Sequence, residues 1–327
     1  MNKEKSSKAT PATGAGAPVP PVALSTSFRA PDMGVRDLMA MLARLRVATV
    51  ELEYRIHDTM LPALRDALRA EGIGVVSVHN VCPFPTRYAK HLKPDGDLFR
   101  LSSVDSDERA LAVKWTTRTI ELASELEAGR VVLHCGRVDM APEVAALHRL
   151  FEAGAIGEPE AAALRERLNA TRERLKGPHL DALMFSLEAL LRPAEALGVR
   201  LGLENRYHHH ELPGSDDFDG LFRVFDGAPV GYWHDLGHAK AVEALGFSAP
   251  GELLTRYGDR LVGIHVHDAD GLDDHRPPGA GKIDFFPLRT INPAIPRVLE
   301  LKPGTPEVDV AAGLDHLRQV FRSKTEH

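Results

Sequence analysis

The sequence predicts an α/β fold, a (β/α)8 TIM barrel with an extra helical insertion. Short runs rich in β-branched residues alternate with longer amphipathic stretches, the order expected of a parallel sheet covered by helices. Eight such runs can be counted, and 327 residues are enough for a barrel of roughly 250 residues with insertions. A doubly wound open sheet is the alternative, but the Gly-x-Gly-x-x-Gly turn that would favour it is missing.

The predicted strands are short apolar runs, whereas the predicted helices repeat apolar residues at i, i+3, i+4 and i+7. The strands are Val22–Ser27, Ala48–Tyr54, Gly74–Asn80, Arg130–Cys135, Arg200–Asn205, Val230–Asp235, Leu261–Asp268 and Arg297–Leu301. The helices between and after them are Asp37–Leu45, Met60–Ala70, Asp107–Leu126, Leu180–Leu197, Phe218–Phe225, Glu252–Tyr257 and Ala311–Phe321.

Three segments depart from this regular alternation. Residues 1–21 are rich in Lys, Ser, Ala, Gly and Pro, and we expect a disordered tail before a catalytic barrel domain at 22–327. Residues 83–105 form a long connection, of a length that usually carries function or is disordered. Residues 141–177 add charged, Ala-rich helix such as Glu158–Leu175. We interpret this insertion as a surface helical hairpin or dimer contact, with a lid over the site as the alternative.

The amino-acid composition disfavours several classes of function. Forty basic against 46 acidic residues give a net charge of −6, which disfavours a dedicated DNA-binding protein. No apolar run approaches the roughly 18 to 20 residues that span a bilayer, so no membrane partner is expected. The two cysteines, Cys82 and Cys135, fit neither a disulfide framework nor a thiolate metal site, so we expect a cytoplasmic protein.

Six successive predicted strands end in, or are followed by, His, Asp or Glu. These residues are His79, His134, Glu204, Asp235 with His238, His265 and Glu300, followed after the seventh strand by Asp273 and His275. Strand ends meet at one face of a TIM barrel, and several carboxylates in one cavity are usually compensated by a cation. Nitrogen and oxygen ligands without thiolate favour Zn, Mn, Fe or Co, at one to three divalent ions per chain.

These motifs resemble the xylose-isomerase-like TIM-barrel superfamily, which also contains endonuclease IV. The resemblance rests on Glu-Asn after the fifth strand, Asp-x-x-His after the sixth, and Asp-x-His before Pro-Gly-Ala-Gly. It implies a central metal site in which the ligands are Glu204, Asp235, His265 and Glu300. By the same resemblance, a second ion would bind His79, His134 and the bridging Glu204, and a third would bind His238, Asp273 and His275.

Two enzyme classes share these ligands. In a sugar or sugar-phosphate isomerase or epimerase, Glu204 and Glu300 would act as ligands and as the acid/base pair. Substrate contacts would come from His267 and Arg206, with Arg276 able to pair with a phosphate. The alternative is a multinuclear-zinc phosphoester hydrolase resembling endonuclease IV, and a non-catalytic metal or sugar-binding barrel is the third hypothesis. The resemblance is also compatible with a homo-oligomer.

Two further groups of polar residues stand near strand ends. Glu51 and Glu53 alternate with apolar residues on the second strand, so both are expected to face the barrel interior. Because Glu53 is nearer the strand end, it is the one we expect to support a metal ligand. The run His208–Glu211 is interpreted as a solvated or substrate-facing loop, since consecutive histidines point in different directions.

Overall fold

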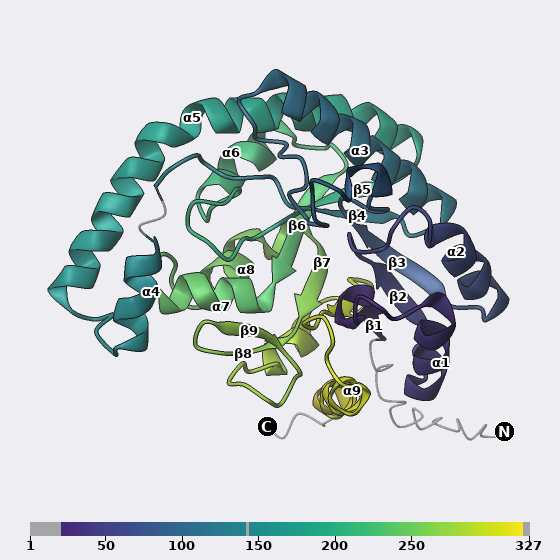
Figure 1. The fold of residues 1–327 in the computed structure, drawn as a ribbon. Helices are drawn as coiled ribbons and strands as arrows, with labels where there is room; N and C mark the ends of the chain where they lie inside the picture. The colour runs from purple at the N-terminus through teal and green to yellow at the C-terminus, as the bar shows by residue number, and fades with distance from the viewer. Residues whose placement is uncertain (1–20, 142–143, 323–327) are drawn as a thin grey trace, which may run out of the picture.

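The structure is a computed structural model that describes residues 21–141 and 144–322. Eight parallel strands close into a barrel in the order β1-β10-β7-β6-β5-β4-β3-β2, with helices around it (Figure 1). The strands are β1 (Val22–Ser25), β2 (Thr49–Leu52), β3 (Gly74–His79), β4 (Arg130–Leu133), β5 (Arg200–Glu204), β6 (Val230–Asp235), β7 (Leu261–Val266) and β10 (Arg297–Leu299). The TIM barrel predicted from the sequence is confirmed.

The first and last barrel strands pair with each other, which closes the sheet. Ala23 of β1 is in register with Val298 of β10, and Leu24 is in register with Val50 of β2. A doubly wound sheet would leave these two edges unpaired, so that alternative is wrong. The predicted strands all lie where the sequence indicated, within a few residues at each end.

The surrounding helices follow the predicted order, with α4 added inside the insertion and α7 added after the sixth strand of the chain. They are α1 (Val35–Leu45), α2 (Leu61–Ala70), α3 (Ser106–Glu125), α4 (Val144–Glu152), α5 (Pro159–Ala196), α6 (Asp217–Val224), α7 (Leu236–Ala244), α8 (Glu252–Tyr257) and α9 (Glu307–Arg322). The sequence analysis does not predict α7. This short helix is buried on most sides, so it lacks the amphipathic repeat that identifies a surface helix.

The insertion forms a helical hairpin, but its second helix is longer than predicted. The predicted helices Glu158–Leu175 and Leu180–Leu197 are one helix, α5, which continues through Pro178 (Figure 1). Proline normally ends or kinks a helix. Here both halves are fixed by packing, since Leu168 lies in a small hydrophobic cluster beside the barrel and Leu187 lies in the main core.

The barrel interior is apolar at its base and polar at the carboxyl ends of the strands. Trp233 is fully buried in a cluster with Ala23, Val132 and Val298. A Cβ atom at Gly263 would lie 2.0 Å from the Trp233 ring, so the indole requires glycine at this neighbouring position. This apolar base leaves the opposite end of the barrel as the place where polar side chains gather.

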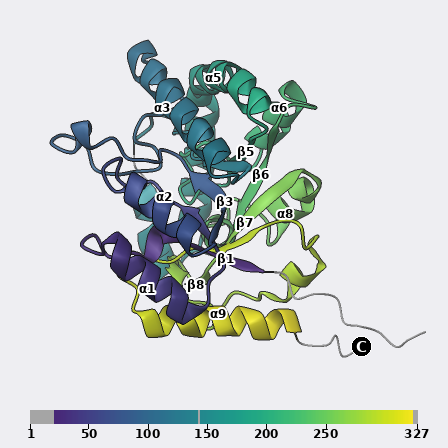
Figure 2. The ribbon, with the colours of Figure 1, turned by 90° about the vertical axis from the view of Figure 1, so that its right-hand side faces the viewer.

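Two peripheral features complete the fold. Helix α9 packs beside α1, where the Arg44 guanidinium donates to Glu307, and Figures 1 and 2 show the two helices together. After β7 the chain forms a two-stranded hairpin, β8 (Asp268–Asp270) and β9 (Asp273–Arg276), before it returns to β10. Among residues 21–141 and 144–322, no helix is long and apolar enough to cross a membrane.

Candidate metal centre

Four side chains meet inside the carboxyl end of the barrel. Glu204 ends β5, Asp235 ends β6, His265 is the second-to-last residue of β7, and Glu300 directly follows β10. All four are buried, and each offers a ligand atom within 4.8 Å of the others. We refer to these four residues as the central quartet. It contains three carboxylates and one imidazole, a donor set suited to Zn, Mn, Fe(II) or Co.

The His265 imidazole lies at the middle of the quartet. Its Nδ1 atom is 2.7 Å from Glu204 Oε1, 3.0 Å from Glu300 Oε2 and 3.7 Å from Asp235 Oδ2. Burial by itself would lower the pKa of His265, but Glu300 and the other neighbouring carboxylates raise it well above its usual value. The carboxylates therefore create a strong preference for positive charge at Nδ1.

Glu51 occupies the other side of the His265 ring. Its two oxygens lie 3.1 and 3.2 Å from Nε2 and accept hydrogen bonds from Ser25 and Ser77. When Nε2 donates to Glu51, the Nδ1 lone pair faces the oxygens of Glu204 and Glu300. These acceptors repel one another unless a cation lies between them, so the residues fit a metal ion. Glu51, rather than the expected Glu53, supports His265, whereas Glu53 pairs with Arg55 at 2.7 Å.

A second possible ligand group lies on the other oxygen of Glu204. His134 Nε2 is 2.8 Å and His79 Nε2 is 3.5 Å from Glu204 Oε2. The Nδ1 atom of His79 lies 3.0 Å from the carbonyl oxygen of Asn80, and donation to this oxygen would direct the Nε2 lone pair toward Glu204. His79, His134 and Glu204 thus form a second group whose atoms could hold an ion.

Arg206 reaches the same oxygen of Glu204. Its guanidinium donates to Glu204 Oε2 at 3.3 Å and to Glu211 Oε1 at 3.0 Å. Asp97, from the long connection after β3, lies 3.9 Å from Arg206 and 4.0 Å from His134. Burial raises the pKa of Asp97 to about 6, although Arg206 opposes this. The predicted long connection therefore contributes a charged side chain beside the centre.

A third group consists of Asp235, His238 and His275. The structure places Asp274, not Asp273, beside it: Asp274 Oδ2 is 3.1 Å from His275 Nδ1 and 3.9 Å from His238 Nε2. Asp273 points to the surface, where it pairs with Lys302 and Arg276. The structure thus does not bring the expected ligand Asp273 to this group. Regular strand alternation would place Asp273 and His275 on the same face. His275 has a φ of 52°, which breaks the alternation, and Asp274 and His275 lie at the group together.

Two of the expected substrate-contacting residues have other partners. His267 is fully buried, and its Nε2 lies 3.0 Å from both Asp235 oxygens while Nδ1 accepts the backbone N–H of His275. It therefore orients Asp235 and has no surface for a substrate. Arg276 is half-exposed and donates to Asp273 and to the carbonyl of Ala280. Of the three, His267 contacts Asp235 and Arg206 contacts Glu204, whereas Arg276 contacts no member of the quartet among its hydrogen-bond partners.

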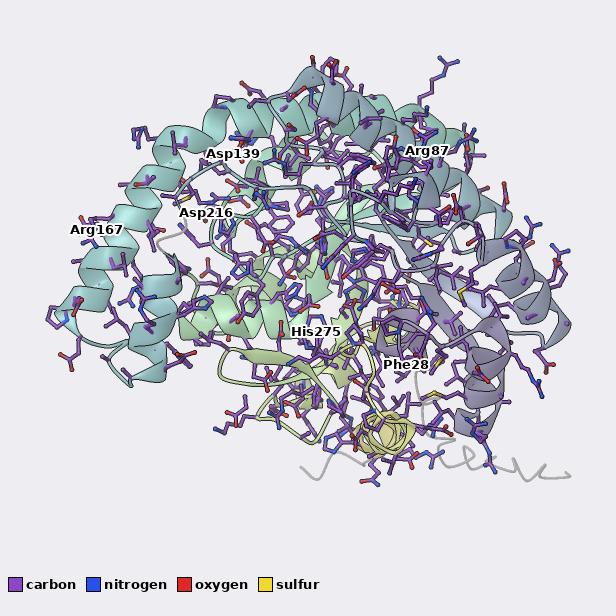
Figure 3. All side chains as sticks on the ribbon, viewed as in Figure 1. Phe28, Arg87, Asp139, Arg167, Asp216 and His275 are labelled. Atoms are coloured by element: carbon purple, nitrogen blue, oxygen red, sulfur yellow. The ribbon has the colours of Figure 1, made fainter. Side chains whose placement is uncertain are left out.

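Sequence reasoning missed several residues at the centre. Glu51 was detectable as a carboxylate on an interior face, but its distance from the strand end was misleading. Asp97 and Glu211 come from loops without regular periodicity, so no pattern indicates where they fold. Asp273 and Asp274 are adjacent and of the same residue type, so only the conformation of the β8–β9 hairpin decides which of them lies beside His275. His275, labelled in Figure 3, lies on this hairpin near the centre of the molecule.

Comparisons with known proteins agree with this architecture. A family model described as xylose isomerase-like TIM barrel matches residues 39–320. A solved D-tagatose 3-epimerase-like protein is 19% identical, with a TM-score of 0.62 over 92% of this chain and 96% of that chain. The 3-keto-D-glucoside 4-epimerase of E. coli is 14% identical, with a TM-score of 0.64 over 91% of this chain and 98% of its own.

A similar curated protein covers less of the chain. An uncharacterized protein of Methanocaldococcus jannaschii is 28% identical over 113 residues, which is 33% of this chain and 37% of that protein. The chain therefore matches little more than a third of this relative's length. The two structural similarities establish the fold.

Proposed function

Because the chain belongs to the xylose isomerase-like TIM-barrel family, we propose that it is a divalent-metal-dependent isomerase or epimerase of sugars or sugar phosphates. One observation carries the proposal. Glu204 and Glu300 come from strands on the two sides of β7, and both lie within 3.0 Å of the same nitrogen of His265. Two carboxylates around one cation position can serve as the base and the acid for proton transfer at the carbon next to a metal-bound carbonyl.

The chain's own residues would divide the chemistry as follows. A divalent ion on the central quartet would polarise the carbonyl of a keto sugar. One glutamate would remove the proton from the carbon next to the carbonyl, and the other would return a proton to the opposite face, which inverts that carbon. Glu51 would hold the His265 ring, and His267 would hold Asp235.

Arg206 favours a single ion over a multinuclear centre. Its guanidinium donates to Glu204 Oε2, the oxygen that a second ion between His79 and His134 would need. A positive charge at this position opposes a second cation. Three quartet carboxylates with one divalent ion leave about one negative charge, which suits a neutral hydroxy-ketone better than a phosphodiester.

The second candidate function is the multinuclear phosphoester hydrolase. It is favoured by the three contiguous groups of ligands, which share Glu204 and Asp235. Several ions sharing carboxylates would stabilise an attacking hydroxide and a leaving oxygen. The two candidates differ in the number of ions bound and in the bond that is broken.

Deuterium exchange tests the proposal. The metal-loaded protein is incubated in D2O with a panel of ketohexoses and their phosphates, and the sugars are examined by NMR. We expect deuterium at the carbon next to the carbonyl, with loss of exchange in Glu204→Gln and no loss in Glu188→Gln on the exposed face of α5. Hydrolysis of a model phosphodiester without any exchange would overturn the proposal.

A further inference from the structure

A cavity of about 280 Å³ lies beside the metal centre, between the insertion and the loop that follows β5. Arg172 on α5, Arg206 and His209 on the loop, and Val242 on α7 are among its lining residues. The insertion thus supplies one wall. Asp216, labelled in Figure 3, is highly exposed and stands at the rim.

Both arginines of the cavity are more than nine-tenths buried. Arg172 donates to Asp217 at 2.5 and 3.4 Å and to the carbonyl of Glu211 at 3.2 Å. Arg206 donates to the carboxylates of Glu204 and Glu211. The Nε atoms of both arginines have no hydrogen-bond partner among the described residues. Each guanidinium therefore has its charge paired with carboxylates but keeps one N–H group without an acceptor.

The acidic groups of the cavity do not supply these acceptors. Glu173 and Asp216 have side chains that are 62% and 81% exposed, and they pair with Lys176 and Arg256, respectively. The lining also includes the two arginines and His209, whose ring stacks on Phe247 with centroids 3.9 Å apart. The apolar side chains of Phe218, Val242 and Leu253 complete this part of it. The exposed acidic residues are thus paired, and the two arginines are the buried charged residues of the lining.

The cavity is also connected to the catalytic glutamate of the proposed function. Arg172 holds the backbone of Glu211, the Glu211 carboxylate holds Arg206, and Arg206 donates to Glu204. The Arg172 guanidinium approaches Gly214 closely, and a Cβ atom there would lie 2.6 Å from its Nη2. A ligand in the cavity would meet the same guanidinium that contacts Glu204.

We propose that this cavity binds a small oxyanion, a phosphate or a carboxylate, through Arg172 and Arg206. Oxyanions are the acceptors that guanidinium groups bind best, because several N–H groups can donate to one anion. The anion is either a free ligand or the phosphate of a sugar phosphate. The site itself does not depend on the proposed isomerase activity, since it requires only the cavity and its two arginines.

Calorimetric titration of the metal-loaded full-length protein with inorganic phosphate tests the site, and acetate serves as the second probe. Arg172→Lys keeps the charge beside Asp217 but removes Nε, and we expect about tenfold weaker binding. Val242→Phe fills the cavity without replacing either arginine and should abolish binding. Arg167→Lys, on an exposed position of the same helix (Figure 3), is the matched control and should bind like the wild type.

The outcomes separate this site from the metal centre. Phosphate that binds equally well to Val242→Phe and Arg172→Lys is bound at the metal ions, which would overturn the proposal, as would binding of neither anion. If a sugar phosphate loses its advantage over the free sugar in Val242→Phe, the anion is part of the substrate. If phosphate binds without competing with the sugar, it is a separate ligand. Binding is measured without turnover, so failure of the isomerase assay leaves this test intact.

Discussion

His265 Nδ1 and Glu204 Oε1 lie 2.7 Å apart although 61 residues separate them in the chain. Their strands, β7 and β5, are not neighbours in the barrel, because β6 lies between them. The contact is therefore made across the interior, where both side chains are excluded from water. Such a pair needs a proton or a metal ion between its lone pairs, and this requirement underlies the function proposed here.

The first prediction concerns the proposed acid/base residue Glu204. Glu204→Gln keeps the shape of the side chain but removes the group that would transfer the proton, so kcat should fall by about 10²- to 10⁴-fold. Circular dichroism and the thermal midpoint check that the variant remains folded. Activity within twofold of the wild type in a folded variant would rule out a role for this carboxylate.

The second prediction concerns Glu51, which contacts His265 but cannot itself reach the quartet's central position. Glu51→Gln should weaken metal affinity by about 10- to 100-fold, because the hydrogen-bond partner of a ligating histidine fixes its tautomer and orientation. A competition titration with a chromophoric chelator measures the dissociation constant directly. Ser77→Ala, which removes one hydroxyl donor to Glu51, is the control and should have a smaller effect.

If Glu51→Gln binds metal as tightly as the wild type, the carboxylate has a purely structural role. A change in kcat alone would not establish the predicted role, since the prediction is about affinity. Measuring both quantities on the same preparation separates the two explanations.

A third prediction concerns the buried ion pair that fixes the insertion to the barrel. Asp217→Asn leaves Arg172 without its carboxylate, and the free energy of unfolding should fall by about 3 to 5 kcal/mol. Asp219→Asn, which breaks an exposed pair with Arg256, should cost less than about 1 kcal/mol. Urea denaturation measures both. Equal, small effects would contradict a stabilising role for the Arg172 pair.

The ion pair between Arg172 and Asp217 also predicts that the free energy of unfolding depends on pH. Burial by itself would raise the pKa of Asp217, but the Arg172 guanidinium holds it below its usual value. The ion pair therefore stabilises the folded protein fully above about pH 3.9, which is the pKa of an aspartate in an unfolded chain. This stabilisation is lost as the pH falls through the lower pKa that Asp217 has in the folded protein. The stability difference between wild type and Asp217→Asn should shrink below about pH 4. A difference that grows on acidification would contradict this assignment.

The fourth prediction distinguishes two adjacent aspartates. Asp273→Asn should leave metal content unchanged, because its carboxylate pairs with Lys302 and Arg276 at the surface. Asp274→Asn should weaken any ion bound near His238 and His275, because its carboxylate lies beside both rings. Elemental analysis of the two variants decides the matter. Loss of an ion from Asp273→Asn alone would show that the hairpin rearranges when metal binds.

Much of the architecture could be predicted because it follows from the periodicity of hydrophobic residues in the sequence. The alternation of short apolar runs with amphipathic helices identified all eight strands, and the His, Asp and Glu residues at their carboxyl ends include the central quartet, which the family resemblance then singled out. Both inferences use regular structure, in which spacing along the chain fixes position in space. Helix α7 was not predicted, because a helix buried on most sides lacks the amphipathic spacing of apolar residues.

What could not be predicted depends on contacts between distant segments. Pro178 suggested a break, yet packing on both sides keeps α5 continuous. Glu53 seemed better placed than Glu51, but the orientation of the His265 ring decides which carboxylate it meets. The role of Arg206 beside Glu204 depends on Glu211, which a loop carries back to it. Such partners follow from the folded geometry and not from the local sequence.

The most direct test of the account is the number of metal ions per chain, measured by elemental mass spectrometry on protein purified without added metal or a histidine tag. We predict one divalent ion, lost in Glu300→Ala and retained in Asp273→Asn. Two or three ions per chain would contradict the single-ion centre and favour the hydrolase. No ion in a folded, active protein would contradict metal dependence altogether.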